Sequence, residues 1–216
     1  MPRVRKLAVA LLLASLVVSG AALAARGDPQ KKITPADQAR AKAMLLRKAD
    51  LGLGFKATPA SVEDDDFYCK ALDESDLTLT GDAESPDFER ELTFVSSLAQ
   101  VYQSVADANA SWRRGTSAAG EKCARDEFRR QFQKDAIRLI SFRRVAFPRL
   151  AQRTAAYRLV AGSQGVRVYI DVVVLQQSRA QAALLLGSAL TPVAKAEEVR
   201  LSRIVAGRMA TAMRGA

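Results

Sequence analysis

Two cysteines, Cys69 and Cys123, carry the clearest chemical signal in this 216-residue chain. In an oxidising compartment an even count of thiols predicts one disulfide. The bond would close the chain from residue 69 to residue 123, and chain-entropy estimates put a crosslink of that span at about 4 kcal/mol. A redox role is the alternative, but the sequence has no Cys-x-x-Cys motif, so a structural bond is predicted.

Catalytic chemistry has few candidates in this composition. The chain contains no histidine, which excludes Ser-His-Asp and Cys-His nucleophile systems and removes the commonest transition-metal ligand. Residues 52–54 read Gly-Leu-Gly but lack the rest of a dinucleotide-binding loop. A hydrolase that works with carboxylates alone stays open, and it predicts two acidic side chains that face each other in a cleft with raised pKa values. The sequence assigns no catalytic residue.

The acidic run at residues 63–66 offers the hard oxygen ligands that calcium prefers. It lacks the glycine and the spaced ligands of a calcium-binding loop, so a solvated loop is predicted there. We therefore expect no metal site and no cofactor.

Opposite charges occupy two separate blocks of the chain. Residues 61–91 hold twelve acidic side chains against two basic ones, and residues 112–158 hold thirteen basic side chains against four acidic ones. Such blocks are typical of surfaces that face each other or solvent. The alternative is a basic face for an anionic envelope polymer or lipid headgroup. Nucleic acid is not expected as a partner, because no recognition motif accompanies the arginines.

Trp112, Arg113 and Arg114 open the basic block and are candidates for a surface contact with a partner protein. Tryptophan and arginine are both enriched at interfaces. The alternative for Trp112 is that it fills a gap in the core at the end of a helix.

The first 24 residues have the organisation of a signal peptide. A basic start precedes an apolar run from Leu7 to Val18, and residues 22–24 form a small-x-small cleavage site. Cleavage would place the mature chain outside the cytosol, secreted or in the cell envelope, with no integral membrane segment. The alternative is a retained anchor, since a spanning helix needs about 20 apolar residues. We expect residues 25–33 to be a flexible lead and residues 34–214 to be a single globular domain.

Periodicity predicts helices at both ends of this domain with a mainly antiparallel sheet between them. The first helix starts at Thr34 and Pro35, which suit a cap and a first helical position, and the last is amphipathic. The expected fold is therefore α+β, an α/β/α sandwich. The expected helices cover residues 34–49, 106–113, 121–133 and 192–213, with a glycine-bracketed turn at 115–120. The expected strands cover residues 77–80, 92–102, 137–147, 153–160, 166–175 and 181–187, of which the last also suits a helix.

A concave pocket between the last helix and the sheet is the predicted ligand site. Its candidate lining residues are Tyr169, Val173, Leu201 and Val205. In the expected strand at 166–175 the even-numbered side chains share a buried face, and the opposite face is expected to start wet, at Asp171 among others. The alternatives for the last helix are plain core packing and peripheral contact with a membrane surface.

Several short motifs together resemble a group of secreted actinobacterial domains. They are Cys69 before the Leu-Thr-Leu-Thr-Gly run at 77–81, Val-Tyr-Gln-Ser at 101–104 followed by Ala-Asp-Ala at 106–108, Trp112, and Val-Tyr-Ile-Asp-Val at 168–172. The chain is similar to the extracellular sensor domains of mycobacterial serine/threonine kinases and to related lipoproteins with a PsbP-like fold. It departs from the kinase sensors in having one cysteine pair, no transmembrane segment after the signal region and no kinase domain. The resemblance implies a binding or accessory role and no catalytic residue.

Two classes of function are therefore expected. The first is a secreted, non-catalytic binding or accessory module for an envelope component, a small apolar ligand or a partner protein. The second is a carboxylate-dependent hydrolase that acts on envelope polymers.

Overall fold

The structure is a computed structural model that describes residues 27–60 and 68–215. The predicted signal peptide at 1–24 and the acidic run at 63–66 lie outside the described residues. No helix in the described ranges is long and apolar enough to cross a membrane.

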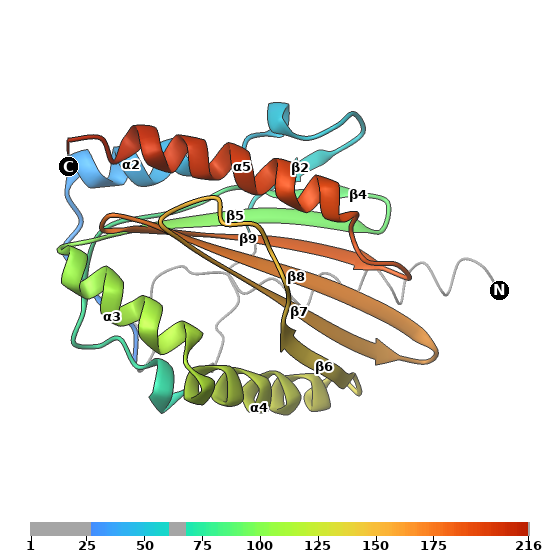
Figure 1. The fold of residues 1–216 in the computed structure, drawn as a ribbon. Helices are drawn as coiled ribbons and strands as arrows, with labels where there is room; N and C mark the ends of the chain where they lie inside the picture. Colours follow the sequence, from blue (N-terminus) through green and yellow to red (C-terminus); the bar gives the residue numbers. More distant parts are fainter. Residues whose placement is uncertain (1–26, 61–67, 216) are drawn as a thin grey trace.

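One mixed sheet forms the middle layer, with helices on both of its faces (Figure 1). Its strands follow the order β1-β3-β5-β9-β8-β7-β6, and β4 pairs with both β5 and β2. Among the strands of the described residues, only the pairing of β1 with β3 is parallel. The strands are β1 (Gln30–Lys31), β2 (Lys56–Thr58), β3 (Thr78–Glu84), β4 (Asp87–Arg90), β5 (Thr93–Tyr102), β6 (Arg138–Arg144), β7 (Arg153–Ser163), β8 (Val166–Gln177) and β9 (Ala180–Ala189).

Helices α2 and α5 cover one face of the sheet, and α3 and α4 cover the other (Figure 1). The helices are α2 (Pro35–Met44), α3 (Val105–Thr116), α4 (Ala118–Lys134) and α5 (Lys195–Ala212), with 3₁₀ turns at Lys48–Asp50 and Lys70–Leu72. The predicted α+β fold, with a mainly antiparallel sheet between helices, is confirmed. The segment at 181–187, which also suited a helix, lies in strand β9.

Side-chain caps set the starts of three helices. Thr34, Ser104 and Ser117 each accept a hydrogen bond from the backbone N–H three residues further on. The glycine-bracketed turn expected at 115–120 is wrong, because both glycines are helical and the chain turns at Ser117 alone. The Ser117 hydroxyl caps α4 and also donates to the carbonyl of Arg114, so one residue is enough to join the two helices.

The second face of β8 starts wet, with Arg167 exposed and Tyr169 half-buried, but the expected wet position at Asp171 is wrong. Val168 and Ile170 face the core under α4, while Val173 and Leu175 face the larger core under α2 and α5. Asp171 lies on the second face and is only 2% exposed. The alternation of the strand was predicted correctly, but helices cover both sides of it.

Part of the segment expected to be a flexible lead is paired with the sheet. Gln30 and Lys31 form β1, and the backbone N–H of Gln30 donates to the carbonyl of Leu77 at 2.9 Å. The proposed boundaries at 25–33 and 34–214 stay predictions.

Candidate functional site

A groove of about 490 Å³ opens on the outer side of the α2/α5 layer. It runs between the end of α2 and the second half of α5, so its walls come from opposite ends of the chain. It is a widely open surface hollow, and most of its lining residues are exposed. The lining residues are Ala43, Arg47, Arg203, Ile204, Gly207, Arg208, Thr211 and Ala212.

Three arginines make the rim of this groove cationic. Arg208 is held in place, because its guanidinium donates to the Leu45 carbonyl at 2.7 Å and to both carboxylate oxygens of Asp50 at 2.6 and 2.8 Å. Arg47 and Arg203 are exposed, and within the described part of the chain no hydrogen bond or ion pair engages the Arg203 guanidinium. Asp50 pairs with Arg208, and among the described residues no acid pairs with the guanidinium of Arg47 or Arg203, so the rim keeps an excess of two positive charges.

Asp50 is an ionised carboxylate that serves Arg208. Burial by itself would raise its pKa, but the hydrogen bonds from Arg208 and from the Arg47 backbone N–H outweigh burial and lower the pKa below its usual value. The Arg208–Asp50 pair therefore ties α5 to the turn after α2 at neutral pH, and it fixes one end of the groove.

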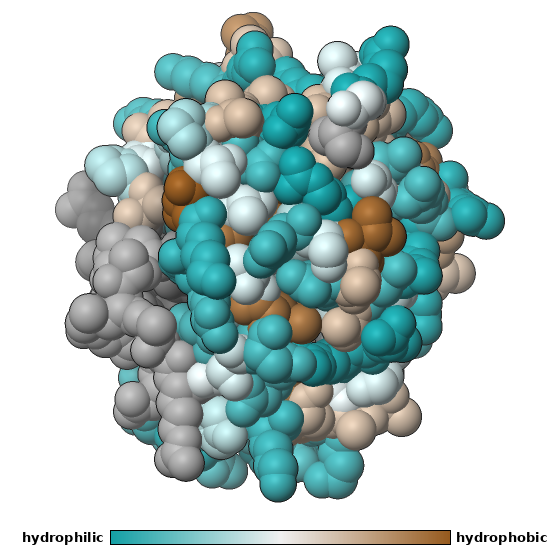
Figure 2. All heavy atoms as spheres, turned by 90° about the vertical axis from the view of Figure 1, so that its left-hand side faces the viewer, coloured by the Kyte–Doolittle hydropathy of each residue, from teal (hydrophilic) through white to brown (hydrophobic). Residues whose placement is uncertain are grey.

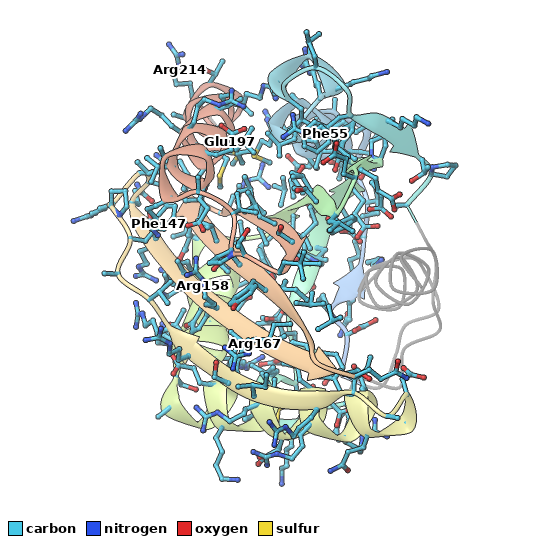
Figure 3. The ribbon with its side chains drawn as sticks, turned by 90° about the vertical axis from the view of Figure 1, so that its right-hand side faces the viewer. Phe55, Phe147, Arg158, Arg167, Glu197 and Arg214 are labelled. Carbon is cyan, nitrogen blue, oxygen red and sulfur yellow. A yellow bond between two sulfur atoms is a disulfide. The ribbon has the colours of Figure 1, made fainter. Side chains whose placement is uncertain are left out.

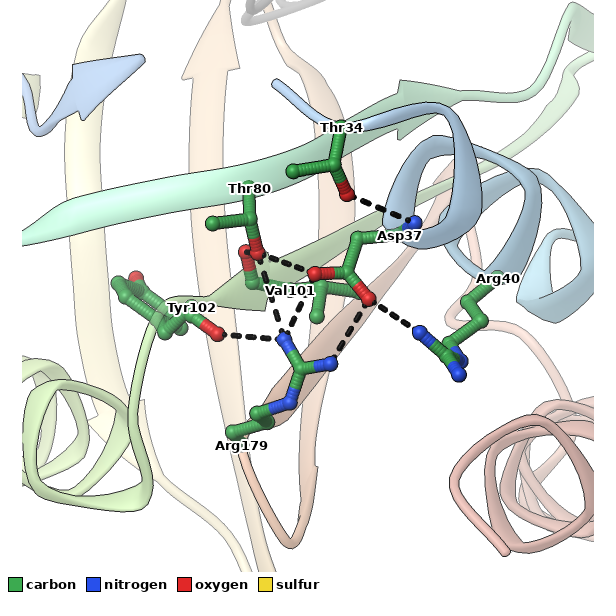
Figure 4. Close-up of polar contacts among 7 residues, drawn as sticks. All are labelled: Thr34, Asp37, Arg40, Thr80, Val101, Tyr102 and Arg179. Atoms are coloured by element: carbon green, nitrogen blue, oxygen red, sulfur yellow. Dashed lines mark hydrogen bonds and ion pairs between the residues drawn. The ribbon is translucent and has the colours of Figure 1, made fainter. Parts of the chain in front are cut away.

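A buried ion pair fixes α2 at its other end (Figure 4). The two carboxylate oxygens of Asp37 accept from the two terminal nitrogens of Arg179, both at 2.8 Å. The hydroxyl of Thr80 and the guanidinium of Arg40 also donate to Asp37, each at 2.6 Å. The Arg179 hydrogen bonds hold the pKa of Asp37 far below its usual range. Asp37 is thus ionised at neutral pH and joins α2 to β3 and to the β8–β9 turn.

Gly81 makes this close approach of α2 to β3 feasible. A Cβ atom on Gly81 would lie 2.3 Å from the backbone oxygen of Asp37, closer than real Cβ contacts allow. Any other residue would push the start of α2 away from the sheet and lengthen the Asp37–Arg179 contact.

A second buried cluster fixes α5. Arg158 on β7 donates to Asp171 at 2.6 and 3.0 Å and to Glu198 at 3.0 Å, so one guanidinium serves two carboxylates. Lys195 donates to the other oxygen of Glu198 at 3.1 Å, and its ammonium lies 3.9 Å from the centre of the Phe147 ring. Figure 3 shows Phe147 and Arg158 on the side of the sheet that faces the start of α5.

Glu198 and Asp171 meet part of the expectation for a carboxylate-dependent hydrolase. Burial and the neighbouring charge of Asp171 raise the pKa of Glu198 above its usual value. The two acids are 1% and 2% exposed, however, and each is engaged by a cation. A hydrolase would need such a pair to face an open cleft, so these contacts describe a structural clip on α5.

The predicted ligand-lining residues face the space between α5 and the sheet, whereas the groove lies on the outer side of α5. Val173, Leu201 and Val205 are all at most 1% exposed and belong to the core between α5 and the sheet. Tyr169 is half-buried, two residues before Asp171 on the same face of β8. The ligand-binding role of these four residues stays a prediction, and the structure does not bring them together with the arginine rim.

The predicted surface-contact residues lie on α3, on the opposite face of the sheet. Trp112 is half-buried and Arg113 is exposed. Arg114 is paired with Asp76 at 2.6 and 2.7 Å and donates to the carbonyl of Asp73 at 2.6 Å. This pairing joins the basic block to the acidic block, as expected for blocks that face each other. The contact role of the three residues stays a prediction.

The disulfide between Cys69 and Cys123 is present, with the two Cα atoms 5.9 Å apart. It attaches the 3₁₀ turn before β3 to α4. A disulfide suggests an extracellular location, because thiols stay reduced in the cytosol. Across residues 27–60 and 68–215 no cluster of three or more metal-ligating side chains occurs.

Sequence reasoning missed the groove, although one signal pointed to it. Arg203 lies off the apolar stripe of the last helix, but nothing in the sequence pairs it with Arg47, which is 156 positions away. The glycine at position 207, inside a helix and next to Arg208, was the visible anomaly. The face at which α2 begins and α5 ends is dominated by hydrophilic side chains, with apolar ones in small separate areas (Figure 2).

No protein-family model matches the chain, and no curated protein matches it. Among solved structures, it is similar to the extracellular domain of PknH from Mycobacterium tuberculosis, with 10% identity, a TM-score of 0.49, and 84% of this chain and 98% of that one covered. It is also similar to an Rv0999 ortholog from Mycobacterium smegmatis, with 14% identity, a TM-score of 0.42, and 80% and 98% covered. The resemblance to mycobacterial extracellular sensor domains is confirmed at this low identity. At TM-scores below 0.5 these likenesses establish neither a shared site nor a shared ligand.

Proposed function

We propose that this chain is an exported, non-catalytic binding module that holds an anionic ligand in the α2–α5 groove. The observation that carries the proposal is the convergence of Arg47, Arg203 and Arg208 on one hollow, where Asp50 pairs with Arg208 alone. Guanidinium groups bind phosphate and carboxylate with directed, charge-assisted hydrogen bonds. The predicted signal peptide and the disulfide support export, and the ligand would then be an envelope component or a molecule outside the cell.

The arginines of the groove differ in what they can offer. Arg208 already donates to Asp50 and Leu45, so it contributes mainly charge and a fixed wall. Arg203 is exposed and has its donors available, which makes it the first contact for an anion. Arg47, on the opposite wall, completes a two-sided clamp.

Inorganic phosphate is the simplest probe of this site. Titration of the isotopically labelled protein should shift the amide signals of residues 203–212 and 43–47 more than those of α4. Arg203→Gln should weaken phosphate binding several-fold, because it removes the available guanidinium. Arg113→Gln removes the same charge from an exposed position on α3 and should leave binding unchanged. Equal binding by both variants, or shifts centred on the basic block of α4, would refute the groove as the site.

A further inference from the structure

The groove continues from its arginine rim onto an apolar floor. Ile204 and Ala212 lie on this floor and pack against the core beneath α5. Ala43 faces them from α2. Between residues 203 and 212 the helix rises about 14 Å. Arg203 lies at the start of this stretch, and Arg208 lies in its middle and donates to Asp50. Gly207, Thr211 and Ala212 line the rest of the hollow, and Arg214 donates to the Thr211 hydroxyl at 3.0 Å at the far end. A ligand that filled it would need a charged end and an apolar body.

Gly207 lies between these two parts of the groove, and the fold itself does not require a glycine there. It is exposed, its φ is not in the positive range, and a Cβ added to it would meet nothing within 4 Å. Glycine inside a helix costs about 1 kcal/mol relative to alanine. Neither a turn nor close packing among the described residues requires this glycine, and its missing side chain leaves the hollow open down to the helix backbone.

Gly115 shows that an open helix glycine alone is not a site. A Cβ added to Gly115 would also meet nothing within 4 Å, but this residue lies in the last turn of α3, away from the groove. Gly207 differs because it faces a hollow with three arginines around it. The pair of glycines therefore offers a matched comparison.

Resting on the proposed anion site, we propose that the ligand is a single-chain amphiphile with a phosphate headgroup, taken up from solution. The headgroup binds Arg203 and Arg47, and the hydrocarbon chain lies over Gly207 toward Thr211 and Ala212. Charge complementarity selects the head, and the continuity of the floor with the core selects an apolar body. Gly207 lets the chain lie against the helix backbone.

Hexyl phosphate and inorganic phosphate separate the chain from the head. Hexyl phosphate should bind about tenfold tighter than inorganic phosphate. In free energy, this gain is about half of what full burial of four methylenes would provide, because the groove is open on one side. Hexyl glucoside, which keeps the chain without the charge, should not bind measurably. Calorimetric titration of the full mature chain measures all three.

A larger side chain on the floor should remove only the gain in affinity that the hydrocarbon chain of hexyl phosphate provides. Gly207→Leu should bring hexyl phosphate down to the affinity of inorganic phosphate, while inorganic phosphate itself binds as before. Gly207→Ala should remove part of the increment and is the readout if the larger side chain prevents folding. Gly115→Leu should leave both affinities unchanged, and thermal melting checks that each variant is folded.

The outcomes distinguish this inference from the proposed function. If inorganic phosphate binds at the groove and hexyl phosphate binds no tighter, the anion site stands and the amphiphile is wrong. If neither probe shifts the groove signals, both proposals fail. Tighter binding of a tetraglutamate peptide would assign the groove to an acidic polypeptide. Sedimentation with vesicles of phosphatidylcholine and phosphatidic acid, without binding of hexyl phosphate, would assign the arginines to a membrane surface. Either result overturns the amphiphile.

Discussion

Replacing Asp37 by asparagine should destabilise the protein by about 3 kcal/mol at neutral pH. Asp37 is 5% exposed and accepts two hydrogen bonds of 2.8 Å from Arg179. Removing one partner of a buried ion pair costs about 3–5 kcal/mol, because the other charge is left without compensation. In the variant, Arg179 can still donate to the carbonyl of Tyr102, at 2.9 Å, and its side chain is partly exposed to solvent. The loss of unfolding free energy should therefore lie at the lower end of that range.

Asp126→Asn is the matched control for this experiment. Asp126 also bonds two cations from its own helix, Lys122 at 2.7 Å and Arg129 at 3.0 Å, but its side chain is 45% exposed. Exposed ion pairs contribute about 0–1 kcal/mol, so this variant should unfold close to the wild type in urea. If Asp37→Asn lowers the unfolding free energy no more than Asp126→Asn does, the buried Asp37–Arg179 pair stabilises the fold no more than an exposed ion pair.

The pH dependence tests the same pair independently. Since Arg179 lowers the pKa of Asp37 in the folded state, the stabilisation is fully present above the unfolded-state pKa of about 4. It is lost as the pH falls through the lower, folded-state value. The difference in unfolding free energy between wild type and Asp37→Asn should therefore be constant above about pH 5 and should shrink below pH 4. A difference that is the same at pH 7 and at pH 3 would refute the assignment.

Three other outcomes are expected. Replacing both cysteines of the Cys69–Cys123 disulfide by alanine should cost about 4 kcal/mol of unfolding free energy, and reducing agent should then have no further effect on urea unfolding. At pH 7 the unfolding free energy of Glu198→Gln should be higher than that of the wild type, or lower by at most about 1 kcal/mol. The reason is that the raised pKa of Glu198 makes its ionised form unfavourable in the fold. The wild type should gain unfolding free energy relative to Glu198→Gln as the pH falls through that pKa. If Glu198→Gln lowers the unfolding free energy by more than about 2 kcal/mol at pH 7, this reasoning is contradicted. Gly207→Ala and Gly115→Ala should each raise the unfolding free energy by up to about 1 kcal/mol, and with it the thermal midpoint. No gain in Gly207→Ala would mean that this glycine has a structural role.

Local patterns were enough to predict the order of elements. Caps, periodicity and breakers are properties of a few neighbouring residues, and they located α2 at Thr34 and the long strands of the sheet. The same local information could not say that both faces of β8 are covered. Asp171 is buried because Arg158 lies opposite it on β7 and Glu198 reaches down from α5, and neither contact leaves a trace in the alternation of the strand.

The candidate site was harder to predict because it is built from the two ends of the chain. An amphipathic α5 predicted a buried face correctly, at Leu201 and Val205. A ligand site was then expected on that buried face. In the structure the buried face is core, and the hollow lies where the outer side of α5 meets α2, a contact that only the folded arrangement defines.

The two buried clusters explain why this hollow can exist between helices that would otherwise be free to close on each other. Asp37 fixes the start of α2 to the sheet, and Glu198 fixes the start of α5. Arg208 then spaces the two elements by its bonds to Asp50 and Leu45. Because these contacts are satisfied without a ligand, the two helices are held in place, and binding would have to order only the exposed side chains of Arg47 and Arg203. For the proposed ligand, we therefore expect Arg203 to set the affinity and the floor at Gly207 to select the apolar body.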